Sequence, residues 1–114
     1  MNTTKLGKAA EDAVAKELKA RGYEILDQNW RTRACEIDIV AKKDAVIYFT
    51  EVKYRASAAQ GTGLDYITGK KLAQLKFAAQ LWSAENDWNG DSRILAAAVN
   101  SSELTPVVEQ IVEI

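Results

Sequence analysis

The order of strand-like and helix-like segments is the feature that most constrains this chain. Three segments rich in branched and aromatic residues follow one another across short polar links, at Tyr23 to Trp30, Cys35 to Ala41 and Val46 to Lys53. Links this short favour antiparallel hairpins. A helical segment, roughly Thr68 to Glu85, then separates the third strand from an apolar strand at Arg93 to Val99. A helix between two strands of one sheet implies a crossover, so this last pair should be parallel.

A further helix is predicted before the first strand. Its apolar residues fall near helical spacing, at Leu6, Ala10, Ala13, Val14 and Ala20. Thr3 or Thr4 can cap its start, and Gly22 stands where the end of a helix often needs a left-handed residue. The later helix has one apolar face, with Leu72, Leu75, Ala79 and Trp82. Residues 1–114 therefore predict a single α/β domain of order αβββαβ, and the tail after Pro106 fits either an edge strand or a short helix.

The composition excludes several classes of site. The 114 residues contain no histidine and one cysteine, which removes histidine-based zinc sites, Ser-His-Asp catalysis and internal disulfides. Without an apolar leader or a long apolar run, we expect a cytoplasmic protein that does not enter a membrane. Residues 1–80 carry 14 Lys and Arg against 10 Asp and Glu, whereas residues 81–114 carry 1 against 6. That polarity permits a basic face for nucleic acid, although charge alone favours a solvated surface.

Two acidic residues on neighbouring strands suggest a site. Strand alternation places Glu51 and Lys53 on the same face as Phe49, where burial is costly unless the charges serve each other or a metal. If residues 42–45 form the hairpin loop, Asp38 lies opposite Phe49 and diagonal to Glu51. A three-residue loop would instead put Asp38 and Glu51 on opposite faces.

Asp38, Glu51 and Lys53 together suit metal-assisted phosphodiester hydrolysis in a chain that lacks histidine. Mg²⁺ binds a few carboxylate oxygens and keeps several waters, and such a bound metal activates water for attack on phosphate. A lysine two residues after Glu51, Lys53, can hold that water or neutralise developing charge. A surface ion pair across two strands would look the same in the sequence, and the Glu-Val-Lys tripeptide alone favours it. Arg31, Arg33 and Arg55 can grip phosphates, although such arginines are usually only solvated.

Several blocks together resemble a known family. They are Gly7 to Glu11, Asn29 to Arg31, Cys35 to Ala41, Glu51 to Arg55 and Ile67 to Lys71. In this order and spacing they are similar to the YraN-like uncharacterised family, which resembles archaeal Holliday junction resolvases in the PD-(D/E)XK, restriction-endonuclease-like superfamily. Departures from the family pattern are Cys35 in place of glycine, Ile37 in place of the proline in the superfamily's name, and Gln74 in place of a frequent basic residue.

The resemblance implies a restriction-endonuclease-like core with a mixed sheet flanked by helices. It implies that Asp38, Glu51 and the backbone carbonyl of Val52 hold Mg²⁺ or Mn²⁺, that Glu11 completes the acidic cluster, and that Lys53 assists the attacking water. It also places Lys71 at a basic position that contacts phosphate. No organic cofactor is implied. Glu11 as a solvated helix residue remains an equal alternative.

Three functions follow as hypotheses. The first is a divalent-metal-dependent endonuclease that cuts DNA, with branched or flapped DNA as candidate substrates. The second is a non-catalytic nucleic-acid-binding module that retains the fold, and the third is a dimeric scaffold. Resolvase-like nucleases are often homodimers, so self-association would not separate the first hypothesis from the third.

Overall fold

The computed structural model describes residues 3–55, 67–102 and 105–114. Two helices and five strands follow in the order α1 (Thr3–Ala20), β1 (Glu24–Arg31), β2 (Glu36–Lys43), β3 (Val46–Arg55), α2 (Gly69–Glu85), β4 (Asp91–Ser102) and β5 (Thr105–Glu113). The predicted αβββαβ order is confirmed. The tail after Pro106, where the sequence fits either a strand or a short helix, forms a strand. Residues 57–63 are small and polar, which predicts a loop, and they lie outside the described residues.

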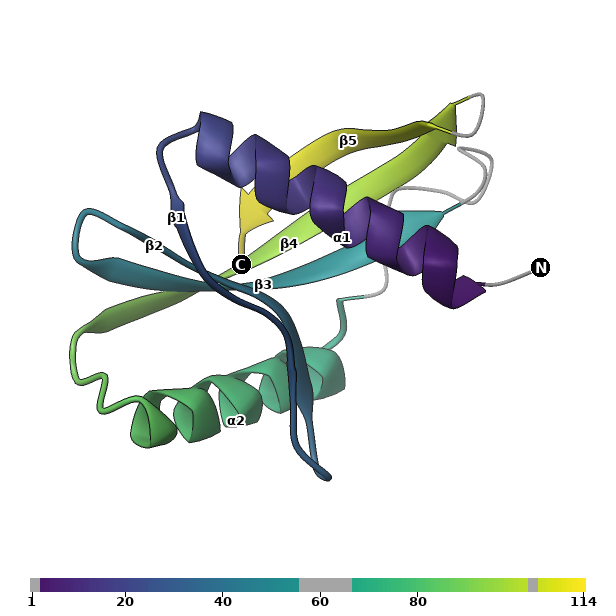
Figure 1. Cartoon of the computed structure of the whole chain (residues 1–114). Helices are drawn as coiled ribbons and strands as arrows, with labels where there is room; N and C mark the ends of the chain where they lie inside the picture. Colours follow the sequence, from purple (N-terminus) through teal and green to yellow (C-terminus); the bar gives the residue numbers. More distant parts are fainter. Residues whose placement is uncertain (1–2, 56–66, 103–104) are drawn as a thin grey trace.

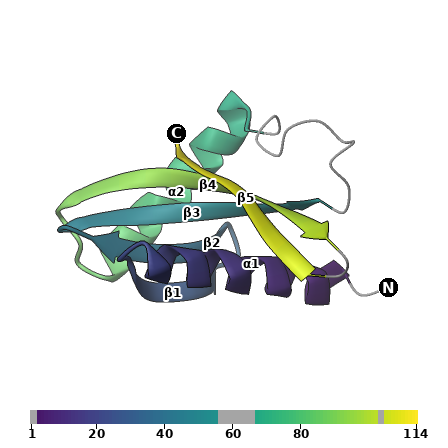
Figure 2. The ribbon, with the colours of Figure 1, turned by 90° about the horizontal axis from the view of Figure 1, so that it is seen from above.

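The five strands form one mixed sheet in the order β1-β2-β3-β4-β5. Neighbouring strands are antiparallel except β3 and β4, which run parallel because α2 carries the chain across between them. In the two views the helices lie on opposite faces of the sheet (Figures 1 and 2). The fold therefore has three layers, and each sheet face has its own helix to bury its apolar side chains. No helix in the described ranges is long and apolar enough to cross a membrane.

The buried side of α1 packs on one face of the sheet. Its fully buried residues, Ala10, Val14, Ala15 and Leu18, follow helical spacing. Ala20, predicted on this side, is exposed, and the helix already includes Thr3 and Thr4, so neither residue precedes its first turn. Gly22 ends the helix as predicted, with a φ of 93°. The N–H groups of Gly22 and Tyr23 donate to the carbonyls of Lys19 and Leu18, both at 3.0 Å, which forms a Schellman cap.

Helix α2 covers the opposite face near β2 and β3. Thr68 caps it, because its side chain accepts a hydrogen bond from the N–H of Lys71 at 3.1 Å. The buried residues of α2 are Leu75, Ala78, Ala79 and Trp82. The Trp82 ring meets Phe49 of β3 edge-on, with 5.6 Å between ring centroids. This contact packs the last turns of α2 against Phe49, on the same strand as Glu51.

The β2–β3 hairpin is tighter than expected. Its turn has only two residues, Asp44 and Ala45, whose φ values of 52° and 65° make a type I′ turn. Lys43 pairs with Val46 and Ala41 pairs with Tyr48, so the predicted pairing of Ala41 with Val46 is wrong by two residues. Asp44 is a residue that such turns favour, but Ala45 is not the glycine that usually follows it, so the sequence did not reveal the turn. The turn is two residues shorter than the predicted loop. Because two is an even number, Asp38 and Glu51 still lie on the same face of the sheet.

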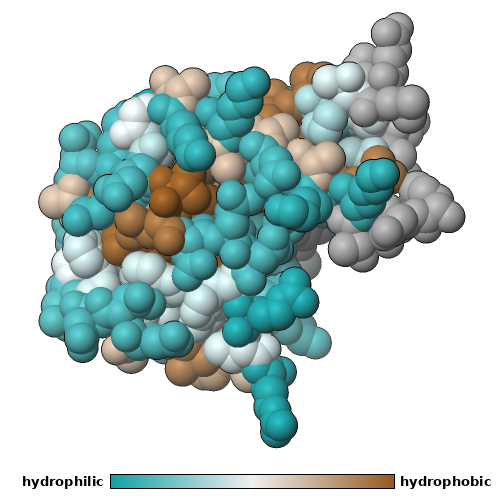
Figure 3. Space-filling view, in the orientation of Figure 1, coloured by the Kyte–Doolittle hydropathy of each residue, from teal (hydrophilic) through white to brown (hydrophobic). Residues whose placement is uncertain are grey.

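The β1–β2 ribbon bends away from the sheet. Pairing shifts between Ile25 and Asp27, and Asn29 adopts a positive φ of 55°. Ile37 and Val40 pack in the same apolar cluster beside α2, which strict alternation along β2 would not allow. The far end of the ribbon consequently projects past α2 (Figure 1), and hydrophilic side chains cover this projection (Figure 3).

Candidate metal and nucleic-acid site

Asp38 and Glu51 meet at the centre of the candidate site. The last pair of the β2–β3 ladder is Ile39 with Thr50, so the next step in register sets Asp38 directly opposite Glu51. The Oδ2 atom of Asp38 accepts a hydrogen bond from the N–H of Val52 at 2.7 Å. Glu51 is only 9% exposed. The shorter turn therefore brings the two carboxyl groups closer than the diagonal placement that the longer loop predicted.

The pKa of Asp38 reflects this crowding. Burial, followed by the negative charge of Glu51, raises its pKa from 3.8 to about 8, against the lowering effect of the Val52 N–H. At neutral pH Asp38 therefore holds a proton in most molecules, and a hydrogen bond to Glu51 favours that protonated form. Two adjacent carboxyl groups that share a proton form a site at which a cation would release the proton and take its place.

Lys71 supplies a positive charge to this pair. Its Nζ atom lies 2.8 Å from Oε2 of Glu51. Burial alone would favour the neutral amine, but the hydrogen bond and charge of Glu51, with the charges of Asp38 and Glu36, raise the pKa of Lys71. The capped first turn of α2 holds the lysine backbone in place. The ion pair thus fixes both Glu51 and the start of α2.

Lys53 lies on β3 two residues beyond Glu51, and its side chain is exposed. Alternation along the strand puts both side chains on one face, as the sequence predicted. The lysine that lies 2.8 Å from Glu51 is Lys71, on α2. The catalytic role of Lys53 stays a prediction.

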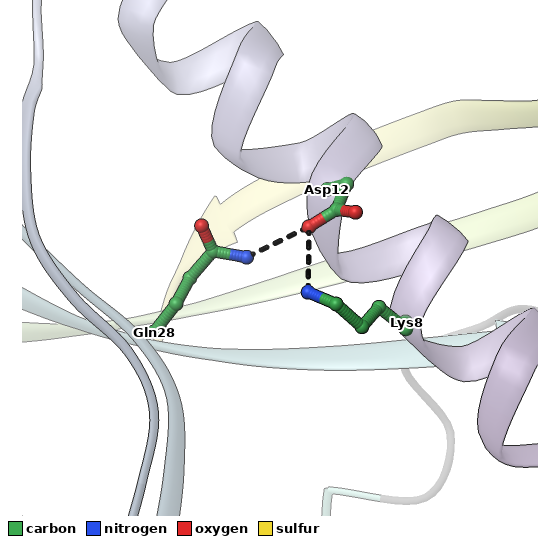
Figure 4. A network of polar contacts seen from close by, with 3 residues as sticks. All are labelled: Lys8, Asp12 and Gln28. Atoms are coloured by element: carbon green, nitrogen blue, oxygen red, sulfur yellow. Dashed lines mark hydrogen bonds and ion pairs between the residues drawn. The ribbon is translucent and has the colours of Figure 1, made fainter.

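Glu11 lies on α1, on the side that faces the ribbon. Its Oε1 atom is buried without a hydrogen-bond partner among the described residues. Burial raises the pKa of Glu11 despite a hydrogen bond from Asn29, and its charge contributes to the raised pKa of Asp38. The neighbouring Asp12 ties this part of α1 to β1, since its Oδ1 accepts from Nε2 of Gln28 at 3.0 Å and lies 3.4 Å from Nζ of Lys8 (Figure 4).

The expected ligand set is only partly assembled. Asp38 and Glu51 are adjacent, and Glu11 lies within electrostatic range of Asp38. In the described parts of the chain, no group of three or more acidic or cysteine side chains is arranged to hold one metal ion. Val52 contributes its N–H to the site, and a role for its carbonyl stays a prediction.

The three candidate phosphate-binding arginines have different surroundings. Arg31 and Arg33 lie at the exposed tip of the ribbon, where Arg31 is 3.9 Å from Glu36. Arg55 is only 8% exposed, and its Nε and Nη1 atoms lack hydrogen-bond partners among the described residues. The tip arginines are therefore accessible to a ligand, whereas Arg55 is enclosed at the end of β3.

Two contributions to the site were missed by sequence reasoning. Lys71 was expected to contact a phosphate, but in the structure it contacts Glu51. This contact was missed because residue spacing does not reveal how α2 is positioned over β3. Asn29 was singled out only as part of a family block. Its pairing neighbours, Gln28 with Ile39 and Trp30 with Ile37, place it opposite Asp38. An asparagine inside a strand is the signal, since it tolerates the positive φ found there.

Comparison with known proteins identifies the family. The sequence profile of the uncharacterised protein family UPF0102 matches residues 10–99. A UPF0102 protein from Parafrankia sp. (strain EAN1pec) is 45% identical over 82 residues, which cover 72% of this chain and 70% of the relative. Another from Sulfurihydrogenibium sp. (strain YO3AOP1) is 36% identical over 105 residues, 91% of each chain. This chain belongs to the uncharacterised protein family UPF0102.

Proposed function

We propose that this chain is a divalent-metal-dependent endonuclease that hydrolyses DNA phosphodiester bonds. The observation that carries the proposal is the buried pair of Asp38 and Glu51, which lie opposite each other on adjacent strands of a restriction-endonuclease-like core. Such a pair is costly in a purely structural role, because burial disfavours a second negative charge beside Glu51 and raises the pKa of Asp38. It is expected where a cation must be held.

The residues fit Mg²⁺ or Mn²⁺. Carboxylate oxygens are the ligands that both ions accept, and the unpartnered Oε1 of Glu11 offers a further one close to Asp38. A divalent cation held there supplies Lewis-acid chemistry, since it polarises the scissile phosphate and acidifies water. Asp38 would give up its proton on binding, and the Val52 N–H would keep its carboxylate oriented.

The lysines then have separate roles. Lys71, released from part of its ion pair with Glu51, would face the phosphate that enters the site. Lys53, exposed on the same face of β3, would hold the attacking water or the negative charge that develops on the phosphate. Arg31 and Arg33 on the projecting ribbon would contact backbone phosphates farther along the DNA.

One observation favours a different function. Lys71 already neutralises Glu51 at 2.8 Å, so the acidic pair is compensated without a metal. A non-catalytic nucleic-acid-binding module, alone or as a dimeric scaffold, would retain this arrangement. The two functions differ in whether DNA is cut.

The test is a cleavage assay on labelled linear, single-stranded, flapped and four-way DNA with Mg²⁺ or Mn²⁺. Wild-type protein should cut at least one substrate, while Asp38→Asn and Glu51→Gln should lose at least a hundredfold in rate. Glu109→Gln, an exposed acid on β5, is the matched control and should cut like the wild type. Folded wild-type protein that cuts no DNA with either metal would exclude the nuclease. Equal cutting by all variants would point to a contaminant.

A further inference from the structure

A cleft lies beside the acidic pair and shares Lys71 with it. It encloses about 470 Å³ between the tip of the β1–β2 ribbon and the first half of α2. Cys35 and Glu36 line it from the ribbon, and Lys70, Lys71, Gln74 and Phe77 line it from the helix. This volume lies within the range of small-ligand sites, and one nucleotide is small enough to enter it.

Phe77 gives the cleft an exposed aromatic wall. Its side chain is 48% exposed, although it is one of the largest apolar residues of α2. Helix residues three, four and seven positions apart lie on one side, so Lys70, Gln74 and Phe77 face the same direction. A flat apolar surface with a cation two turns away matches a nucleotide, whose base stacks while its phosphate pairs with the lysine.

Lys71 connects the cleft to the acidic pair. It lines the cleft and also contacts Glu51 at 2.8 Å, so the two regions share a wall. A nucleotide whose base lay on Phe77 would therefore bring its own or a neighbouring phosphate toward Asp38 and Glu51. A base held inside a duplex cannot stack on a side chain in this way, because its faces are already covered by neighbouring bases.

We propose that this cleft binds an unpaired nucleotide, with Phe77 as the stacking surface and Lys70 and Lys71 as phosphate contacts. The inference rests on the proposed function and narrows its substrate. DNA with unpaired bases, as at a flap or a branch, is then bound in preference to a continuous duplex. The selectivity arises from one side chain, so it can be separated from the general attraction of cations for DNA.

The experiment measures binding in EDTA, where no cleavage occurs. Fluorescein-labelled oligonucleotides are titrated at low salt as a single strand, a flapped duplex and a blunt duplex of the same sequence. Phe77→Ala should weaken single-strand and flap binding about five- to hundredfold, the range expected for loss of one stacking contact. Blunt-duplex binding should stay within about twofold of the wild type. Phe77→Tyr should retain the affinity, and Phe77→Leu, apolar but without a ring, should lose it.

Leu81→Ala is the matched control. Leu81 lies one turn further along α2, is 36% exposed and does not line the cleft. It should bind all three DNAs like the wild type. A 2-aminopurine base in the single strand should be quenched by wild-type protein and by Phe77→Tyr, but not by Phe77→Ala, which reports the stacking directly.

Three results would overturn the inference. They are unchanged single-strand binding by Phe77→Ala, an equal loss on blunt duplex, or a change of sedimentation coefficient in Phe77→Ala, which would make this face a contact between two copies of the chain. Failure of the proposed nuclease gives a different pattern. In that case no DNA is cut with any metal, while the Phe77-dependent preference for unpaired DNA in EDTA persists.

Discussion

The carboxyl group of Asp38 is held by the backbone N–H of Val52, at 2.7 Å from Oδ2 to the nitrogen. Val52 directly follows Glu51, so this hydrogen bond joins the two acidic residues through the backbone of β3 as well as through their side chains. In a chain without histidine, the backbone provides the orienting contact that a second side chain often supplies. The Val52 N–H therefore orients the Asp38 carboxyl group before any metal or DNA arrives.

Asp38→Asn should make the stability of the protein less dependent on pH. A carboxyl whose pKa is raised on folding favours the folded state below its ordinary pKa, and this advantage is lost as pH rises toward about 8. In EDTA, the free energy of unfolding of the wild type should therefore fall between pH 5 and 8, relative to the variant, by up to about 1.4 kcal/mol per pH unit. Urea denaturation at pH 5, 6, 7 and 8 measures the difference.

Asp44→Asn is the control for that prediction, because it removes a carboxylate from an exposed turn while keeping a residue that tolerates positive φ. Its difference between pH 5 and 8 should match that of the wild type. If the free energy of unfolding of Asp38→Asn and of the wild type changed with pH in the same way, Asp38 would ionise in the folded protein without cost. That result would contradict the raised pKa of Asp38.

Lys71→Met should destabilise the protein at neutral pH. The substitution keeps most of the side-chain volume but leaves Glu51 buried without its cation, a loss of about 1–2 kcal/mol. Lys70→Met is the matched control, because Lys70 is exposed and has no ion pair with a described residue. Denaturant midpoints of the two variants should differ clearly, and equal midpoints would mean that the Lys71–Glu51 contact adds nothing to stability.

Glu11→Gln should weaken metal binding without removing it. Glu11 lies within electrostatic range of Asp38 but is not adjacent to it, so we expect a loss of about tenfold in Mn²⁺ affinity, or roughly 1.4 kcal/mol. Calorimetric titration of Mn²⁺ measures this loss. Asp12→Asn changes the next residue, which faces Gln28 and Lys8, and should bind Mn²⁺ like the wild type. A Glu11→Gln protein with wild-type affinity would restrict the ligands to β2 and β3.

Ala45→Gly should stabilise the β2–β3 hairpin. Ala45 has a φ of 65°, which costs a side-chain-bearing residue about 1 kcal/mol and costs glycine almost nothing. Ala73→Gly on the exposed side of α2 is the control, and it should destabilise the protein by about the same amount, because glycine weakens a helix. Thermal unfolding should show a higher midpoint temperature than the wild type for Ala45→Gly and a lower one for Ala73→Gly. A destabilised Ala45→Gly protein would contradict the type I′ turn.

The sequence predicted the elements better than it predicted the contacts between them. Periodicity identified both helices and four of the strands, and the crossover argument gave the parallel pairing of β3 and β4. Asp38 and Glu51 were placed on one face from alternation together with an assumed four-residue loop. The register was wrong because Asp44 and Ala45 form a two-residue type I′ turn, and Ala45 is not the glycine that usually marks it. The contact of Lys71 with Glu51 depends on how α2 packs on the sheet, which no local pattern encodes, whereas an asparagine within a strand does mark the positive φ at Asn29.

The two-residue turn also limits how this protein can diverge. Every partner along β2 and β3 is set by counting outward from Asp44 and Ala45. A single inserted or deleted residue that shifted this register would turn Asp38, with the other side chains of β2, to the opposite face of the sheet. Among relatives that keep the acidic pair, we therefore expect length changes in this turn to occur in steps of two residues, or to be absent. An alignment of hairpin lengths alone could then separate chains that retain the site from chains that have lost it.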